Sequence, residues 1–423
     1  MKQKHHRMLC AFCALVILVS TVFPTAAFAE QPVDVAAAEQ TLTRADAAEM
    51  QQADAAVTAL TESEQYQEMD TDARKDAALA QLDTLTAKGL VEKDSIYTDE
   101  ENGMVSFRYP CGVLGGILLT EPEDETLDEE NAETETASNA LPLRLPPDLG
   151  AEMQKSRAAL LRRTENQAVE KFGTAVIYYA FDNTINSSRF PYYSYMQGFW
   201  SALGLETKIN IHVTVADLKK MGNYNVNVLS AHGSYYTYSY GKFLKRTRTE
   251  PIMLLTEEST FGKDLRYGFD LLAHRVIKVN GMYCVTSDFF RNAYKGGKLS
   301  NTIVYSETCE FLGVDGSEDD AMADALLSGG AQAVIGYVNN VYTVYSRSML
   351  WDTINHLIMG QNVGQALEHA KATYGEDDLI WYHAQGGRRP HAAASYAVLY
   401  GNSQAALHVP ESNRSMFSAD LAA

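Results

Sequence analysis

Residues 301–313 read Asn-Thr-Ile-Val-Tyr-Ser-Glu-Thr-Cys-Glu-Phe-Leu-Gly, and the fold of the chain can be worked out from this stretch. The apolar run 303–305 predicts a short buried strand that leads into a loop carrying Cys309. Residues 226–234 follow the same pattern, because a second apolar run ends there at His232 and Gly233. Two strand ends, one with a histidine and one with a cysteine, supply what a thiol nucleophile and its acid–base partner need.

Short apolar runs and helical patterns alternate on both sides of this stretch. Strands are predicted at residues 175–180, 209–213, 226–232, 303–305, 333–337 and 396–401, and helices at 192–203, 215–221, 321–327, 346–359 and 363–372. Ser317 and Asp320 resemble a capping box for the helix that starts at residue 321. Such alternation predicts an α/β fold, with a mostly parallel sheet covered by helices on both faces. Reactive groups in sheets of this kind gather at the carboxyl ends of the strands, where His232 and Cys309 both fall.

The first 29 residues have the features of a secretory signal peptide. Lys2 and Lys4 begin a basic segment, residues 9–22 form an apolar run too short for a membrane span, and Ala27-Phe28-Ala29 fits a cleavage site. The mature chain is therefore expected to start at Glu30, to carry no membrane span, and to be secreted or held at the surface of a bacterial cell.

Composition divides the remaining chain into four segments. Residues 30–120 are expected to form a small, mainly helical region, with a half-buried strand near 104–109. Residues 121–147 are a run of acids that ends in prolines, as in a linker. The α/β domain spans 148–410, and 411–423 form a tail. A helical region, a linker and a larger domain suit a zymogen with a prosegment, but a spacer or adhesion module has the same layout.

Charge and cysteine content narrow the possible partners. The formal net charge of the 423-residue chain is −19, which argues against nucleic acid as the main partner. A protein or peptide substrate is expected instead from the chemistry of His232 and Cys309. Removal of the signal peptide leaves Cys111, Cys284 and Cys309, so at least one thiol is free or is paired between molecules. The apolar surroundings of Cys284 predict a buried structural thiol. A Cys111–Cys284 disulfide remains open.

The two strand ends together suggest acyl-transfer chemistry. Cys309 would attack a peptide carbonyl, and His232 would protonate the leaving amine. The backbone N–H groups of Gly233 and Cys309 could hold the oxyanion. Taken singly, a cysteine or a histidine after a strand is more often a packing residue.

No cofactor is expected, and no transition-metal site. The other histidines of the mature chain show no metal-binding spacing, and His369 and His383, which lie on or after helices, are interpreted as structural or surface residues. These histidines are His212, His274, His356, His369, His383, His391 and His408. Calcium could be bound by Asp315, Glu318, Asp319 and Asp320, although helix capping explains these acids equally well.

Three segments carry a resemblance to a known family. Residues 230–234 (Ser-Ala-His-Gly-Ser), 305–310 (Tyr-Ser-Glu-Thr-Cys-Glu) and 330–337 (Gly-Ala-Gln-Ala-Val-Ile-Gly-Tyr) resemble clan CD cysteine peptidases. That clan includes caspases, legumain, gingipains, clostripain and the related CHAT domains. The resemblance covers about residues 175–408, and it implies a caspase–haemoglobinase fold with a dyad at Cys309 and His232. Residues 398–403 are similar to the closing strand and turn of gingipain-like domains, with Asn and Ser in place of Asp and Pro.

The resemblance also implies roles for residues outside the dyad. In several members the residue two before the nucleophile helps to form the specificity pocket, and here it is Glu307. A buried carboxylate there would select a cationic side chain, which predicts cleavage after Arg or Lys. The alternative is that Glu307 pairs internally with an arginine. Family members often cleave themselves, and the candidate sites are residues 245–248 (Lys-Arg-Thr-Arg), Arg144, Arg157, Arg162 and Arg163.

Sequence analysis therefore favours a secreted cysteine endopeptidase. The competing hypothesis is a catalytically silent CHAT-like interaction module that binds a partner through the tyrosine-rich residues 235–240. Thr308, where Ala is common, and Phe311 and Leu312, where small residues often follow, depart from the family pattern and keep that hypothesis open.

Overall fold

The computed structural model describes residues 41–120, 149–164, 169–181, 191–241, 245–379 and 394–417. The expected signal peptide (1–29), the acidic linker (121–147) and the end of the tail (418–423) lie outside these residues. No helix within the described ranges is long and apolar enough to cross a membrane.

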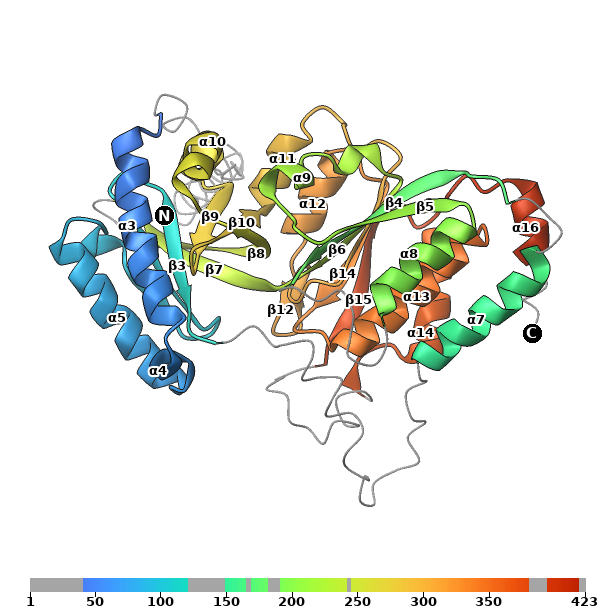
Figure 1. The fold of residues 1–423 in the computed structure, drawn as a ribbon, viewed down its shortest axis with the longest axis horizontal. Helices are drawn as coiled ribbons and strands as arrows, with labels where there is room; N and C mark the ends of the chain where they lie inside the picture. Colours follow the sequence, from blue (N-terminus) through green and yellow to red (C-terminus); the bar gives the residue numbers. More distant parts are fainter. Residues whose placement is uncertain are drawn as a thin grey trace, which may run out of the picture. The chain divides into compact units, whose positions relative to one another are not determined.

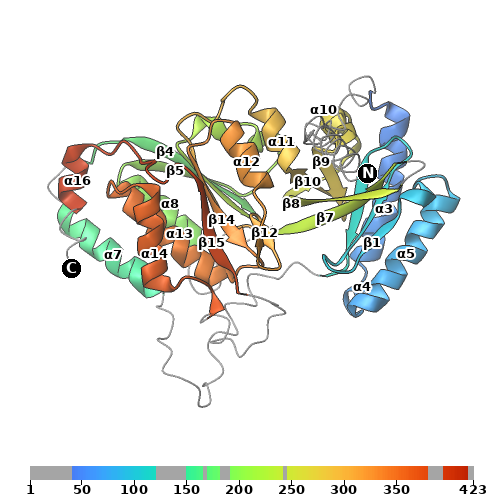
Figure 2. The ribbon, with the colours of Figure 1, turned by 180° about the vertical axis from the view of Figure 1, so that it is seen from behind.

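A six-stranded sheet forms the centre of the α/β part (Figures 1 and 2). Its order is β15–β14–β11–β6–β4–β5. The strands are β4 (Gly173–Ala180), β5 (Leu205–Asn210), β6 (Val226–Ala231), β11 (Ile303–Ser306), β14 (Ala333–Val338) and β15 (Tyr396–Gly401). Five run parallel, and β15 is antiparallel to β14 at one edge. Every residue of β6, β11 and β14 is buried, as expected for strands covered on both faces.

Helices cover both faces of this sheet, so the predicted α/β class is confirmed. The core on one face includes residues of α7 (Leu149–Thr164), α8 (Tyr192–Ala202), α13 (Thr343–Ile358) and α14 (Val363–Tyr374). The core on the other includes residues of α9 (Val215–Leu218), α11 (Ser287–Ala293) and α12 (Ala321–Ser328). Strand β11 shows the division, since Ile303 and Tyr305 join the first core and Val304 the second. A last helix, α16, spans Glu411–Phe417.

A second sheet has seven strands in the order β1–β2–β3–β9–β10–β8–β7. They are β1 (Tyr97–Asp99), β2 (Met104–Arg108), β3 (Leu114–Leu118), β7 (Gly233–Tyr240), β8 (Arg246–Glu258), β9 (Val276–Val279) and β10 (Met282–Thr286). The associated helices are α3 (Arg44–Thr61), α4 (Glu64–Gln67), α5 (Thr71–Ala87), the 3-10 turns η1 (Lys93–Ser95) and η2 (Met221–Asn223), and α10 (Phe261–Leu272). Three strands therefore come from the N-terminal region and four from residues 233–286.

The N-terminal region is mainly helical as expected, but its three strands belong to a sheet shared with residues 233–286, which the sequence analysis did not predict. Strand β3 pairs in parallel with β9, so residues 114–118 and 276–279 lie side by side in one sheet. The two segments are far apart in the sequence, and neither local pattern specifies the other as its partner. The residues before the linker are thus built into the same sheet as an insertion of the α/β domain.

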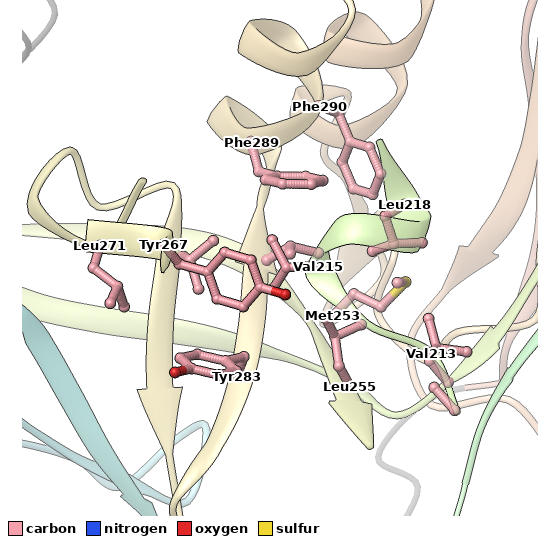
Figure 3. Close-up of a cluster of buried hydrophobic side chains, with 14 of the residues drawn as sticks. Val213, Val215, Leu218, Met253, Leu255, Tyr267, Leu271, Tyr283, Phe289 and Phe290 are labelled. Carbon is pink, nitrogen blue, oxygen red and sulfur yellow. The ribbon is translucent and has the colours of Figure 1, made fainter. Parts of the chain in front are cut away.

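One hydrophobic core joins the two sheets. It contains N-terminal residues such as Leu82, strand residues such as Val304, and the helices between them. Figure 3 shows part of it, where Leu218, Met253 and Phe290 come from α9, β8 and α11. Tyr267 and Tyr283 also meet there edge to face, with ring centroids 5.3 Å apart.

Two local predictions were wrong. The strand expected at 209–213 lies at Leu205–Asn210, because Gly204 at φ +98° ends the preceding helix and the chain enters the sheet at once. The capping box is absent, since Ser317 belongs to β13 (Ser317–Glu318), which pairs with β12 (Gly313–Val314). The connecting Asp315 and Gly316 both have positive φ, as a type I′ hairpin turn requires. The Asp-Gly pair in the sequence therefore indicated a hairpin here.

Candidate active site

The predicted nucleophile and its partner lie on the same cavity. His232 follows β6 and Cys309 lies three residues after β11, so parallel pairing of these two strands brings the two loops to one edge of the sheet. Both residues line a cavity of about 340 Å³, together with Gly233, Glu307 and Ser346. The sequence therefore predicted correctly which distant residues the sheet brings together.

His232 is the single residue between strand β6 of the six-stranded sheet and strand β7 of the seven-stranded sheet. Strand β6 ends at Ala231 and β7 begins at Gly233 (Figure 1). The carbonyl oxygen of His232 accepts a hydrogen bond of 2.9 Å from the backbone N–H of Leu254. The imidazole packs edge-on against the ring of Phe181, with centroids 4.5 Å apart. Backbone and ring are therefore each held by a neighbouring element.

Gly233 allows the two loops to touch. A Cβ at this position would overlap the carbonyl oxygen of Cys309 and would lie 2.5 Å from Cγ2 of Thr308. No side chain fits in that space, so the His-Gly loop can pack against the cysteine loop only with glycine here. Close packing of the two loops is therefore a sufficient reason for glycine at position 233, separate from the expected role of its N–H in binding an oxyanion. The same contact sets the position of His232 relative to Cys309.

Cys309 is in an environment unlike that of the other two thiols. Its side chain is half-buried, and Sγ accepts a hydrogen bond of 3.4 Å from the backbone N–H of Val341. The thiol also lies 3.9 Å from the carbonyl oxygen of Val341, to which it can donate, so the backbone of this one residue holds the sulfur on both sides. Burial raises the pKa of Cys111 to about 11 and raises that of the fully buried Cys284 further. Cys111 and Cys284 are not joined by a disulfide in this structure, and the prediction of a buried Cys284 thiol is confirmed.

Glu307 lies at the cavity, with its carboxylate held by hydroxyl groups. The residue is only 5% exposed. Its Oε2 accepts a hydrogen bond of 3.0 Å from Tyr193 Oη, and its Oε1 accepts one of 3.3 Å from Ser346 Oγ. Arg347 reaches the same group through Tyr193, because its Nε donates to that hydroxyl at 3.3 Å and its guanidinium lies over the tyrosine ring. Tyr193, Ser346 and Arg347 come from helices whose contact with this loop is not visible in the sequence.

Glu310 is a further site residue that the sequence analysis did not single out. It follows Cys309 at φ +54° and lines the cavity. Burial, and to a lesser degree the charge of Asp315, raises the pKa of Glu310 from 4.5 to about 7. Its position after Cys309 was visible, but its burial depends on packing. A carboxyl group that titrates near neutral pH therefore lies next to the thiol.

The N-terminal region also contributes to the cavity. Glu101, Asn102 and Gly103, in the turn between β1 and β2, line it together with the His and Cys loops. No sequence motif indicated this, because the contact depends on the shared seven-stranded sheet.

Two of the four acids proposed for calcium, Glu318 and Asp319, accept hydrogen bonds from the protein. Asp319 accepts hydrogen bonds from Tyr235 Oη (3.0 Å) and the Ala321 backbone (2.9 Å), and Glu318 accepts one from Tyr400 Oη (2.8 Å). Within the described ranges, one group of three His, Cys, Asp or Glu side chains brings its ligand atoms together, and these acids are not part of it.

The predicted self-cleavage sites differ in accessibility. Arg246 and Arg248 lie in β8 and pair with β7, and Arg248 also forms ion pairs with Glu250 (3.5 Å) and Asp288 (3.2 Å). Arg157 lies on α7. Backbone within a paired strand or a helix must open before it can be cleaved. Arg144 and the side chains of Arg162 and Arg163 lie outside the described part of the chain.

The tyrosine-rich segment is not an exposed surface. Tyr235, Tyr236 and Tyr238 in β7 are 4%, 0% and 3% exposed, so the binding surface expected for an interaction module is buried. Their hydroxyls are used internally, as when Tyr236 Oη donates to the Gly115 carbonyl at 2.8 Å.

Comparison with known proteins gives no family assignment. No protein-family model matches this chain. No curated protein sequence matches it either.

Proposed function

We propose that this protein is a cysteine endopeptidase that uses a Cys309–His232 dyad and cleaves after Arg or Lys. The observation that carries the proposal is the convergence of His232, Cys309 and the buried Glu307 on one cavity, with Gly233 packed against the Cys309 carbonyl. The five parallel strands with an antiparallel edge strand are compatible with a caspase–haemoglobinase fold.

The proposed mechanism assigns a separate task to each residue. His232 takes the proton of Cys309, and the thiolate attacks the substrate carbonyl. Backbone N–H groups of Gly233 and Cys309 hold the oxyanion, and the imidazolium protonates the leaving amine. Water, with His232 as base, then hydrolyses the thioester and restores the thiol. Glu307 binds the cationic side chain that precedes the scissile bond.

The carboxylate of Glu307 supports the choice of a cationic substrate. The hydroxyls of Tyr193 and Ser346 donate to its two oxygens and orient the carboxylate at the cavity. A buried carboxylate facing a cavity favours a ligand of opposite charge, because its burial is otherwise costly. Arg347 is the competing internal partner, and it reaches Glu307 through the Tyr193 hydroxyl.

We further propose that the protein is secreted through the signal peptide and that the N-terminal region acts as a prosegment. Its three strands are shared with residues 233–286, so cleavage in the linker should leave it bound. Size-exclusion chromatography after limited trypsin treatment would show both fragments eluting together. Free release of residues 30–120 from a folded remainder would contradict this expectation.

The decisive experiment uses residues 30–423 and a peptide library that varies the residue before the scissile bond. We expect cleavage after Arg or Lys that is absent in Cys309→Ala. Glu307→Gln should reduce cleavage after Arg or Lys by about 100-fold, because the substrate cation loses its partner. Unchanged Arg preference in Glu307→Gln would refute the specificity assignment while keeping the thiol mechanism. Absence of any activity, even after the linker is cut, would favour a catalytically silent binding module.

A further inference from the structure

Two helices of the α/β part carry a second group of chemically active side chains. Asp352 and His356 are one helical turn apart on α13, and His369 faces them from α14. One ligand atom from each of the three lies within 4.8 Å of the others. We propose that Asp352, His356 and His369 form a binding site for a divalent transition metal of the zinc class.

The distances suit a metal with nitrogen and oxygen ligands. Nδ1 of His369 lies 2.7 Å from Oδ2 of Asp352, and Nε2 of His356 lies 3.7 Å from Oδ1 of the same carboxylate. Ligands of a tetrahedral zinc ion at about 2.0–2.1 Å are separated by about 3.4 Å. The observed distances lie on either side of this value, so small side-chain rotations would complete the geometry. Two imidazoles and a carboxylate are donors that zinc and similar ions prefer.

The two imidazoles lie next to each other, so one ion can reach both. The rings of His356 and His369 have centroids 3.7 Å apart and an interplanar angle of 36°. A metal uses the in-plane lone pair of each neutral imidazole, so the rings would turn out of this stacked arrangement when an ion binds.

The surroundings of His356 provide the outer contact that metal-bound histidines usually have. Nδ1 of His356 and Oε1 of Gln361 are both buried, and neither makes a hydrogen bond within the described residues. Metal-binding histidines commonly donate their second ring N–H to a carbonyl or carboxylate oxygen. Gln361 interacts with this imidazole, so a slight rotation of His356 toward the metal could pair the two unsatisfied atoms.

The site is accessible from one side. Side-chain exposure is 7% for His356, 15% for Asp352 and 46% for His369. An ion could enter past His369, and three protein ligands would leave a fourth position for water or an incoming group. Bound metal would join α13 to α14 and should stabilise the fold.

The sequence contained part of this signal. Asp352 and His356 have the i, i+4 spacing that places two ligands on one helix face. His369 lies thirteen positions further on, and only the antiparallel packing of α14 against α13 brings it into reach. The expectation that His369 is a structural or surface residue arose because spacing along the chain was the only guide.

The test uses residues 30–423 with Cys309→Ala, so it does not depend on peptidase activity and the reactive thiol cannot bind metal. After dialysis against a chelator, Zn²⁺ is titrated calorimetrically, and Co²⁺ is titrated while visible absorption is followed. We expect one equivalent to bind, with Co²⁺ bands typical of nitrogen and oxygen ligands, and Zn²⁺ to raise the Tm.

His369→Gln is the main variant, because this half-exposed side chain can be replaced without unfolding the protein. It should weaken Zn²⁺ binding at least tenfold and remove the Tm increase. His212→Gln, which changes an exposed histidine elsewhere, is the matched control and should behave like the parent. Equal binding by His369→Gln and the parent, no saturable binding, or Co²⁺ bands typical of thiolate ligation would overturn the proposal.

Discussion

The two sheets differ in the partners that surround their buried charged side chains. Just beyond β11 of the six-stranded sheet, Glu307 lines a cavity and accepts hydrogen bonds from the hydroxyls of Tyr193 and Ser346. In the seven-stranded sheet, Lys278 of β9 is fully buried and forms ion pairs with Asp54 of α3 and with Asp264 of α10 at 2.9 Å. The first carboxylate lies at the wall of a cavity, whereas the second group pairs a buried lysine with two carboxylates inside the protein.

The difference follows from strand direction. Parallel strands bring all their carboxyl ends to one edge, where loops from distant segments meet and can form a site. The seven-stranded sheet is mostly antiparallel, so neighbouring loops fall at alternating edges. Its buried polar residues therefore join elements together. Tyr283, for example, donates to Asp264 at 2.8 Å.

The largest expected effect separates the cysteines of the two sheets. Cys309→Ala should lower kcat/KM by about 10⁴-fold or more, because it removes the nucleophile. Cys284→Ala, in the interior of the seven-stranded sheet, should leave catalysis intact and only lower stability. Peptidase assays on both purified variants, with Cys111→Ser alongside, would measure this contrast. A comparable loss of activity in folded Cys284→Ala would contradict the assignment of a catalytic role to Cys309 and a structural role to Cys284.

Lys278→Met tests the structural role of the second sheet. The substitution leaves Asp54 and Asp264 buried without a cation, so the free energy of unfolding should fall by about 3–5 kcal/mol. Denaturant unfolding would measure it. The control is Lys219→Met, which breaks an ion pair with Asp270 at a lysine that is 42% exposed and should cost under about 1 kcal/mol. Equal losses of unfolding free energy in the two variants would show that the buried ion pairs of Lys278 stabilise the fold no more than a partly exposed ion pair does.

Gly233→Ala tests the contact between the His and Cys loops. The added Cβ overlaps the Cys309 carbonyl, so the loops must separate, and a misplacement of about 1 Å can cost about 100-fold in rate. Steady-state kinetics and a melting curve would be compared with Gly262→Ala, where an added Cβ meets nothing within 4 Å. Near-normal kcat in folded Gly233→Ala would mean that the glycine does not position the dyad.

Glu310→Gln should have the smallest effect, seen in the pH profile. Because the folded-state pKa is raised from 4.5 to about 7, ionisation of Glu310 destabilises the fold progressively between these pH values. Above pH 7 its negative charge also disfavours the neighbouring thiolate. Wild-type activity relative to Glu310→Gln should therefore fall severalfold from pH 6 to pH 8. Glu376→Gln, at an exposed glutamate, is the control, and parallel profiles for wild type and Glu310→Gln would refute the assignment.

Local sequence patterns predicted most strands of the six-stranded sheet and both reactive loops. Apolar runs such as 175–180 and 333–337 must be strands buried on both faces, and alternation with helices makes them parallel. Parallel pairing then places the residues that follow β6 and β11 at one edge. This is why His232 and Cys309 could be paired from the sequence, although they are far apart in the chain.

Tertiary structure alone decided how the remaining segments combine. The pairing of β3 with β9, the approach of Glu101 to the cavity and the meeting of His369 with Asp352 all join distant segments. The amphipathic pattern of each segment says that one face must be buried, but it does not specify the partner. That choice depends on which surfaces fill the shared core, and so does the pKa of Glu310, because burial is a property of the packed chain.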